Sequence, residues 1–143
     1  MTVTAEPRTD RRHQECLYRA QELAGLHDIA RRNYADIRCL EARLTEVMDD
    51  DWWIDRYLDV PRPALARLRK GSKWGGIAAA DGIWIRTLDD ATLLHELSHW
   101  VTDSPGHGPE FAETFLAMVR RYMGFHAYGA LRTGLIEAGY WAI

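Results

Sequence analysis

The stretch that decides the fold of this chain is residues 89–101, Asp-Asp-Ala-Thr-Leu-Leu-His-Glu-Leu-Ser-His-Trp-Val. It contains neither glycine nor proline, and an acidic residue at its start, Asp89 or Asp90, can cap a helix. Residues four apart on a helix lie one turn apart on the same side. The spacing therefore places His95 and His99 side by side, where two imidazoles can bind one metal ion.

The apolar residues of this helix lie on the side opposite the two histidines. With about 100° of turn per residue, His99 is rotated by about 40° from His95, and Glu96 by about 100°. An arc from roughly 140° to 260° holds the apolar side chains: Leu93, Leu94, Leu97, Trp100 and Val101. We therefore expect the histidines to face a site and not the core. Glu96 is too far round to be a close ligand, but it can activate a metal-bound water as a general base.

A third histidine follows in the segment after this helix. Catalytic zinc commonly has three protein ligands and one open position. His107 follows a Pro-Gly pair that can turn the chain, and Pro109 favours the start of a new helix. If His107 is only a loop or capping residue, Glu110 or Glu113 would supply a carboxylate ligand, with Glu113 the better placed. The sequence thus predicts His107 as the third zinc ligand and Glu113 as the fallback, although manganese or cobalt could replace zinc.

Chance occurrence of the His-Glu-x-x-His pattern on a surface helix is an alternative that the motif leaves open. Three other histidines occur singly and are expected to take no part in the site: His13, His27 and His126. Candidates for stabilising an oxyanion are named by residue type alone: Tyr128, Tyr140, His126 and Arg132. Neutral metal-bound imidazoles need acceptors for their second N–H group, and two residues are expected in that role: Asp103 and Glu113.

The rest of the chain indicates an α+β fold. The length of 143 residues and the apolar content of 47% fit a single domain, expected at 10–143 after a flexible arm at 1–9. Asp81-Gly82 suits the tight turn of a hairpin. The expected elements are a helix at 10–32 with a break or kink at Gly25, an undecided segment at 35–44, a short helix at 52–58, strands at 64–70, 74–79 and 82–86, and helices at 90–103, 109–124 and 127–139.

Charge and composition narrow the classes of partner. A net charge of −3 and a pI of about 6.0 give no overall basic excess, which argues against nucleic-acid binding but leaves room for a local basic groove. Cys16 and Cys39 are too few for a disulfide framework and are expected to be buried free thiols. We expect a cytoplasmic protein, because neither a signal peptide nor a run near the ~18 apolar residues of a membrane span is visible.

Two segments, LLHELSHWV at 93–101 and HGPEFAETFLAMV at 107–119, resemble the SprT-like and related minimal zincins. The closer likeness is to small single-domain metallohydrolases of high-GC bacteria and their phages, in which a hairpin precedes the histidine-bearing helix. The likeness covers residues 64–123. It implies a zincin-like fold, with a small, mostly antiparallel or mixed sheet and an N-terminal helix packed alongside. It also implies three zinc ligands and one general base: His95, His99, His107 and Glu96.

The resemblance further implies that the strand at 82–87 forms the edge of the cleft, where an extended peptide can pair as an added strand. SprT proteins often carry a Cys-rich zinc ribbon and act on DNA-bound protein. This sequence shows neither a ribbon nor a basic tail, so the DNA-repair role does not transfer. The expected function is a zinc-dependent metallopeptidase with a protein or peptide substrate. The alternatives are a zinc hydrolase acting on another amide or an ester, and a non-catalytic zinc-stabilised interaction protein, and the oligomeric state is left open.

Overall fold

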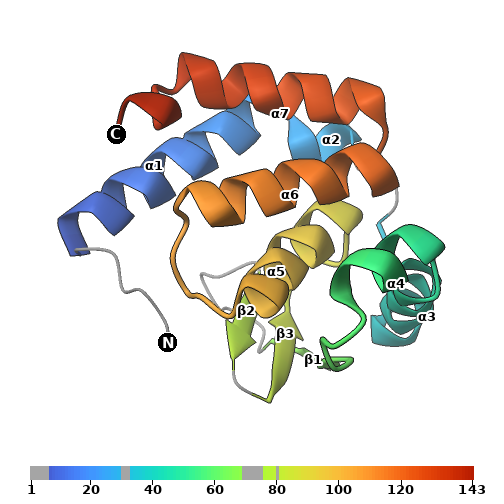
Figure 1. Cartoon of the computed structure of the whole chain (residues 1–143). Coiled ribbons are helices and arrows are strands. Elements are labelled where there is room, and N and C mark those ends of the chain that lie inside the picture. Colours follow the sequence, from blue (N-terminus) through green and yellow to red (C-terminus); the bar gives the residue numbers. More distant parts are fainter. Residues whose placement is uncertain (1–6, 30–32, 69–75, 80) are drawn as a thin grey trace.

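A computed structural model of the chain describes residues 7–29, 33–68, 76–79 and 81–143. These residues form helices and one small sheet, which confirms the α+β class. Among the described helices, none combines the length and apolarity that a membrane span requires. The elements follow one another in this order (Figure 1): α1 (Pro7–Ala24), α2 (Leu26–Ile29), α3 (Ile37–Met48), α4 (Asp51–Tyr57), β1 (Ala64–Arg67), β2 (Gly76–Ala79), β3 (Gly82–Ile85), α5 (Asp90–Thr102), α6 (Pro109–Tyr122), α7 (Phe125–Glu137) and a final 3₁₀ turn (Tyr140–Ala142).

The sheet is mixed, and its middle strand is β3. This strand runs parallel to β1 and antiparallel to β2. Ile83 and Ile85 are fully buried, because a central strand with one face on the core can hide its apolar side chains. The expectation that residues 82–87 form the cleft edge is therefore wrong. The outer strand that contacts α5 is β2, which precedes β3 in the hairpin.

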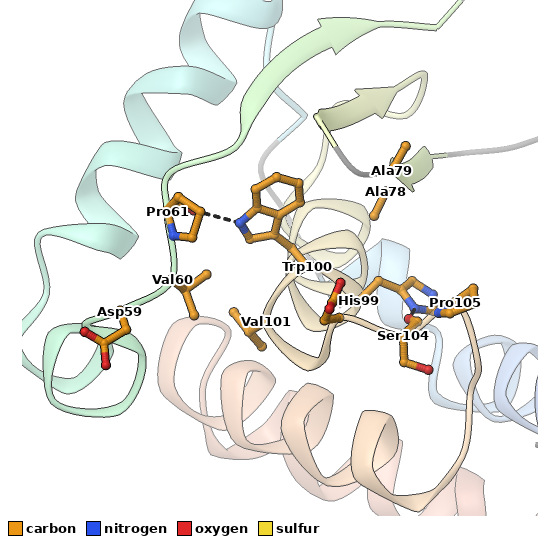
Figure 2. Close-up of a pocket in the computed structure, with 11 residues that line it drawn as sticks. Asp59, Val60, Pro61, Ala78, Ala79, His99, Trp100, Val101, Ser104 and Pro105 are labelled. Atoms are coloured by element: carbon orange, nitrogen blue, oxygen red, sulfur yellow. Dashed lines mark hydrogen bonds between the residues drawn. The ribbon is translucent and has the colours of Figure 1, made fainter. Parts of the chain in front are cut away.

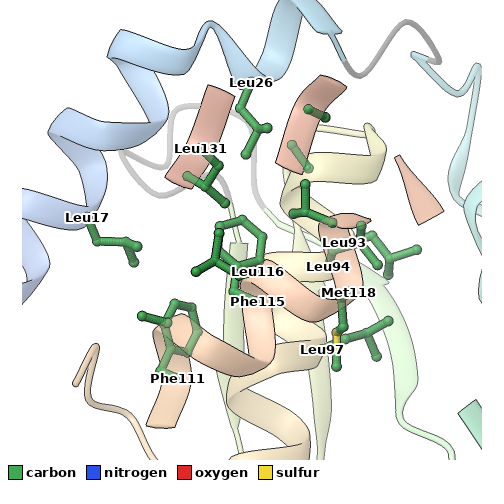
Figure 3. Packing of buried hydrophobic residues seen from close by; sticks show 14 of the residues in the cluster. Leu17, Leu26, Leu93, Leu94, Leu97, Phe111, Phe115, Leu116, Met118 and Leu131 are labelled. Atoms are coloured by element: carbon green, nitrogen blue, oxygen red, sulfur yellow. The ribbon is translucent and has the colours of Figure 1, made fainter. Parts of the chain in front are cut away.

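The helices form layers above this sheet (Figure 1). α5 lies between the sheet and α6, while α1 and α7 pack along each other beyond α6. The expected packing of the N-terminal helix alongside the domain is thereby confirmed. The core fills the space between these layers, and Figure 3 shows its central side chains: Leu17, Leu26, Leu93, Leu94, Leu97, Phe111, Phe115, Leu116, Met118 and Leu131.

Local signals locate most element boundaries to within a few residues. α1 starts at Pro7, so the last residues of the expected arm are helical, and Gly25 ends the helix with φ +60°. The undecided segment at 35–44 belongs to helix α3, whose first turn is capped by the Asp36 carboxylate accepting the Cys39 N–H at 3.0 Å. Residues 69–75, which include the ends of two expected strands, lie outside the described residues.

Both cysteines are free, as expected, but they differ in exposure. Cys16 is half-buried, and its thiol donates to the carbonyl of Ala138 at 3.3 Å. Cys39 is exposed, which contradicts the expected burial. It lies on the outer side of α3, whose buried side is formed by Leu40, Leu44 and Val47.

Candidate metal centre

Helix α5 carries the motif and begins with a capped turn. The Asp89 carboxylate accepts the N–H of Thr92 at 2.8 Å, which satisfies one of the free amides at the helix start. The rings of His95 and His99 lie 5.2 Å apart, as their spacing of one turn requires. His95 is not open to solvent, however, since it is only 5% exposed, whereas His99 is half-buried. α6 packs against α5 and places the Phe111 ring 5.0 Å from the His95 ring and 4.4 Å from the His99 ring. α1 reaches His95 through Gln21, and β2 lies against Glu96.

The loop after α5 brings His107 back to this pair. Asp103 ends the helix in the left-handed conformation with φ 49°. The N–H of His107 donates to the Asp10 carboxylate at 3.1 Å, and its carbonyl accepts the Tyr140 hydroxyl at 2.5 Å. Pro109 then starts α6 in the first helical position. The backbone of His107 is thus held from both ends of the chain.

Three imidazoles converge where these elements meet. One ring nitrogen each from His95, His99 and His107 lies within 4.8 Å of the other two. The Nε2 atoms of His99 and His107 are 3.1 Å apart. Two nitrogens bound to one tetrahedral ion at about 2.05 Å are separated by about 3.4 Å. The group therefore fits a metal ion with small adjustments of the side chains.

Hydrogen bonds orient two of the rings so that their Nε2 atoms face inward. His95 Nδ1 lies 3.0 Å from Gln21 Oε1, and His99 Nδ1 lies 2.8 Å from the carbonyl oxygen of Ser104. Because these oxygens accept, each Nδ1 carries the proton and each Nε2 keeps its lone pair. The sequence predicted Asp103 and Glu113 as the acceptors, and for these two rings that prediction is wrong. A buried amide and a backbone carbonyl take that role without adding a negative charge.

Helix α1 provides much of the surroundings of the three histidines. Its residues Asp10, Tyr18 and Gln21 lie on one helical face and reach the site. The Tyr18 ring lies nearly parallel to that of His95, with centroids 5.8 Å apart. Sequence reasoning missed these residues. The only signal for them in the sequence is that these polar side chains share one face of the helix. Such a pattern does not indicate which distant residues that face contacts.

Burial keeps the three imidazoles neutral. Removal from water lowers the pKa of His95 well below its usual value, and it lowers the pKa of His107 to about 4. Repulsion between the protonated forms of neighbouring rings lowers both pKa values further. The pKa of His99 is also lowered by burial, although the Ser104 carbonyl opposes this. Neutral imidazoles at pH 7 are the protonation state that metal binding requires.

Glu96 lies beside these rings, against the edge strand β2. Its side chain is 5% exposed, and burial raises its pKa to about 7 against the opposing effect of a hydrogen bond from the Ala78 backbone. A β-carbon at Gly76 would lie 2.8 Å from Glu96 Cγ, which is closer than such contacts allow. Glycine at this position therefore lets the strand approach the carboxylate.

The structure separates the remaining candidates from the site. Glu110 and Glu113 are exposed on α6 and are not among the described groups whose ligand atoms converge. Tyr140 is buried, and its hydroxyl donates its hydrogen bond to the His107 carbonyl. Three other candidates for oxyanion stabilisation lie on α7: His126, Tyr128 and Arg132. None of them lines either of the two pockets beside the three histidines.

Two pockets flank the histidines. The larger, of about 490 Å³, opens beside His99 and is lined mainly by apolar side chains of three segments (Figure 2): Val60, Pro61, Ala78, Trp100, Val101 and Pro105. The smaller, of about 220 Å³, lies beside Glu96 and His95 and is lined by polar side chains that include Tyr18, Gln21 and His27. His27 is fixed there by Asp89, with its Nδ1 2.7 Å from the carboxylate. The structure thus has a pocket on either side of the three histidines.

Comparison with known proteins adds no relative to this description. Neither a family model, nor a curated protein, nor a solved structure matches the chain. Inference about function therefore rests on the geometry of the site.

Proposed function

We propose that this chain is a zinc-dependent hydrolase of the SprT-like, zincin-like type, and that it cleaves peptide bonds. The observation that carries the proposal is the convergence of three neutral imidazoles, two of them buried and that of His99 half-buried, beside a buried carboxylate. An accidental motif on a surface helix would leave the histidines exposed and without oriented partners. Here two of them have acceptors for their Nδ1 protons, and the third comes from a separate loop.

The donor set suits zinc. Three nitrogen ligands that leave one coordination position free are the usual arrangement in catalytic zinc sites. A zinc ion bound there would lower the pKa of a coordinated water to about 7 and polarise a substrate carbonyl. Its ligands would be the residues expected from the sequence: His95, His99 and His107.

Glu96 is proposed as the general base and acid. Its carboxylate lies beside the proposed ligands, where it would take a proton from the attacking water and pass that proton to the leaving amine. The hydrogen bond from the Ala78 backbone and the close approach of Gly76 hold its carboxylate in place. Tyr18, which lines the same pocket as Glu96, replaces the α7 residues as the candidate donor to the oxyanion.

A peptide substrate is favoured by the position of β2. This strand pairs with β3 along one side, and none of the strands within the described residues pairs with its second side. An extended peptide can add to such an edge through backbone hydrogen bonds. The scissile bond would then lie next to Glu96, because β2 passes over that residue.

The test compares Glu96→Gln with the matched control Glu113→Gln, both loaded with zinc. We expect Glu96→Gln to keep its zinc and to lose at least about 100-fold in the rate of hydrolysis of an unfolded protein. Glu113→Gln should retain both, because Glu113 is exposed on α6. Equal rates in the two variants would refute Glu96 as the catalytic group.

The second candidate is a zinc-stabilised interaction protein without activity. It is favoured by the position of the proposed metal, which would link the α5–α6 loop to α5. Helix α1 contacts two of the ligands, so the metal would also stabilise the packing of that helix. In that case wild-type protein binds zinc and hydrolyses neither proteins, nor other amides, nor esters. Hydrolysis of small amides or esters alone would instead indicate a non-peptide substrate.

A further inference from the structure

The small pocket beside the candidate metal position is lined mainly by polar side chains. It has a volume of about 220 Å³ and lies next to His95 and Glu96. Its walls come from α1, α2, α5, the start of β2 and the segment that follows β3. Because α2 contacts both α1 and α5, side chains from three helices meet in this pocket. The hydrogen-bonding capacity that these side chains have left indicates what the pocket can bind.

The Gln21 side chain offers an unused donor to the pocket. Its Oε1 lies 3.0 Å from His95 Nδ1 and accepts the proton of that ring, which leaves the amide nitrogen as the second polar group. Gln21 is only 7% exposed, and none of the described residues accepts a hydrogen bond from this nitrogen. Since a buried donor without a partner is costly, a ligand oxygen or a water must accept from it.

His27 adds a second donor, which carries positive charge when protonated. Its Nδ1 donates to the Asp89 carboxylate at 2.7 Å, so Nε2 is the ring nitrogen left for a ligand. The hydrogen bond to Asp89 raises the pKa of His27, although burial opposes this. The same carboxylate accepts the N–H of Thr92 at 2.8 Å. The imidazole is therefore oriented by a carboxylate that is itself fixed at the start of α5.

The other groups that line the pocket complete a set suited to an anion. Thr92 is 6% exposed, and its hydroxyl has no partner among the described residues. Arg86 also lines the pocket, and Glu96 is the one carboxylate among the described residues that do so. Glu96 would repel a second carboxylate, but a divalent ion held by three neutral histidines would offset that repulsion. An apolar side chain would instead leave the donors without acceptors.

We propose that this pocket binds a carboxylate group of the substrate next to the scissile bond, through the Gln21 amide, the His27 imidazole and the Thr92 hydroxyl. The carboxylate is that of an acidic side chain or that of the peptide C-terminus, since both present the same pair of oxygens. The inference rests on the proposed function, because it names the substrate class of the same site. It also gives a role to His27, which the sequence analysis expected to take no part in the site.

The test measures the binding of four matched hydroxamates to the zinc-loaded wild type by calorimetry. A hydroxamate binds the metal and so keeps the attached residue near the pocket. In the first pair, a malonyl hydroxamate is joined to alanine with a free carboxylate or to alanine amide. In the second pair, it is joined to aspartate amide or to asparagine amide. In at least one pair we expect the carboxylate to bind about tenfold or more tightly than its neutral match, and that pair identifies the source of the carboxylate.

Variants show whether the pocket causes this preference. His27→Gln removes the charge and should reduce the preference to less than about threefold, whereas His126→Gln, at an exposed histidine on α7, should keep it. Thr92→Val is the second variant, because it removes the hydroxyl and keeps the backbone N–H that Asp89 accepts. It should also weaken the preference. The zinc content of each variant is measured alongside, since neither His27 nor Thr92 belongs to the converging group.

Equal affinities within both pairs, tighter binding of the neutral probes, or a lack of binding by all four overturns the inference. A preference that persists in both His27→Gln and Thr92→Val overturns it as well, because the metal alone would then attract the carboxylate. The proposed function fails separately. Hydrolysis of an unfolded protein without any carboxylate preference leaves the hydrolase standing. The expected preference in a protein that hydrolyses nothing refutes the hydrolase and supports the carboxylate pocket.

Discussion

At the scale of single residues, Gly76 is the point where the edge strand and the proposed general base meet. We expect Gly76→Ala to push the Glu96 carboxylate aside, because the added β-carbon would lie 2.8 Å from Glu96 Cγ. Since misplacing a catalytic group by even 1 Å can cost about 100-fold, hydrolysis should fall about 10- to 100-fold while zinc content stays unchanged. Gly129→Ala, whose new β-carbon would meet no described residue from outside its own helix turn within 4 Å, is the control. Full activity of Gly76→Ala would show that the contact is unimportant.

Protonation of the ligand histidines gives a second prediction at this scale. In the metal-free protein, burial lowers the pKa of His107 to about 4, and it also lowers the pKa values of His95 and His99. Their contribution to stability is complete above the unfolded pKa of about 6.5 and is lost as the pH falls toward the folded values. For His107 alone, the free energy of unfolding should fall by about 2 kcal/mol between pH 7.5 and 5. Denaturant titrations of chelator-treated protein measure this loss. A His107→Asn variant with the same pH dependence as the wild type would contradict it.

At the scale of elements, local patterns predicted the parts whose signals are local. The α5 helix could be predicted from its cap, its lack of glycine and proline, and its histidine spacing. The contribution of α1 could not, because Gln21 meets His95 across 74 positions of the chain. The place of β3 in the sheet was mistaken for a similar reason. Strand order depends on pairing between distant segments. Nothing in the sequence of the β2–β3 hairpin indicates that β1 pairs with β3 and so makes β3 the middle strand.

The crossing of α1 and α7 should control how α1 meets the site. A β-carbon at Gly134 would lie 2.6 Å from the carbonyl oxygen of Ala20, so Gly134→Ala must force the two helices apart. We expect the free energy of unfolding to fall by about 1–3 kcal/mol and zinc affinity to weaken, because Gln21 moves with α1. Gly129→Ala on the same helix meets no neighbour and should be neutral or slightly stabilising. Similar stability of the two variants would exclude a tight crossing.

At the scale of the whole molecule, the proposed metal lies where the layers meet. Its ligands come from α5 and the following loop, and α1 supplies the partners of two of them. Because only the folded chain brings these groups together, zinc binding should stabilise folding. At a free zinc concentration of about 1,000 times Kd the gain is about 4 kcal/mol. Chelation should then lower Tm by about 10 °C in calorimetry. An unchanged Tm in a protein shown to bind zinc would contradict this coupling.

The most direct test of the central claim is elemental analysis of the wild type beside His107→Ala and His126→Ala. His126 is exposed on α7 and serves as the control, since it lies outside the converging group. We predict about one zinc ion per chain in the wild type and in His126→Ala, and little or none in His107→Ala after dialysis. A wild type that takes up no zinc, or a His107→Ala variant that holds as much as the wild type, would contradict the proposed metal centre.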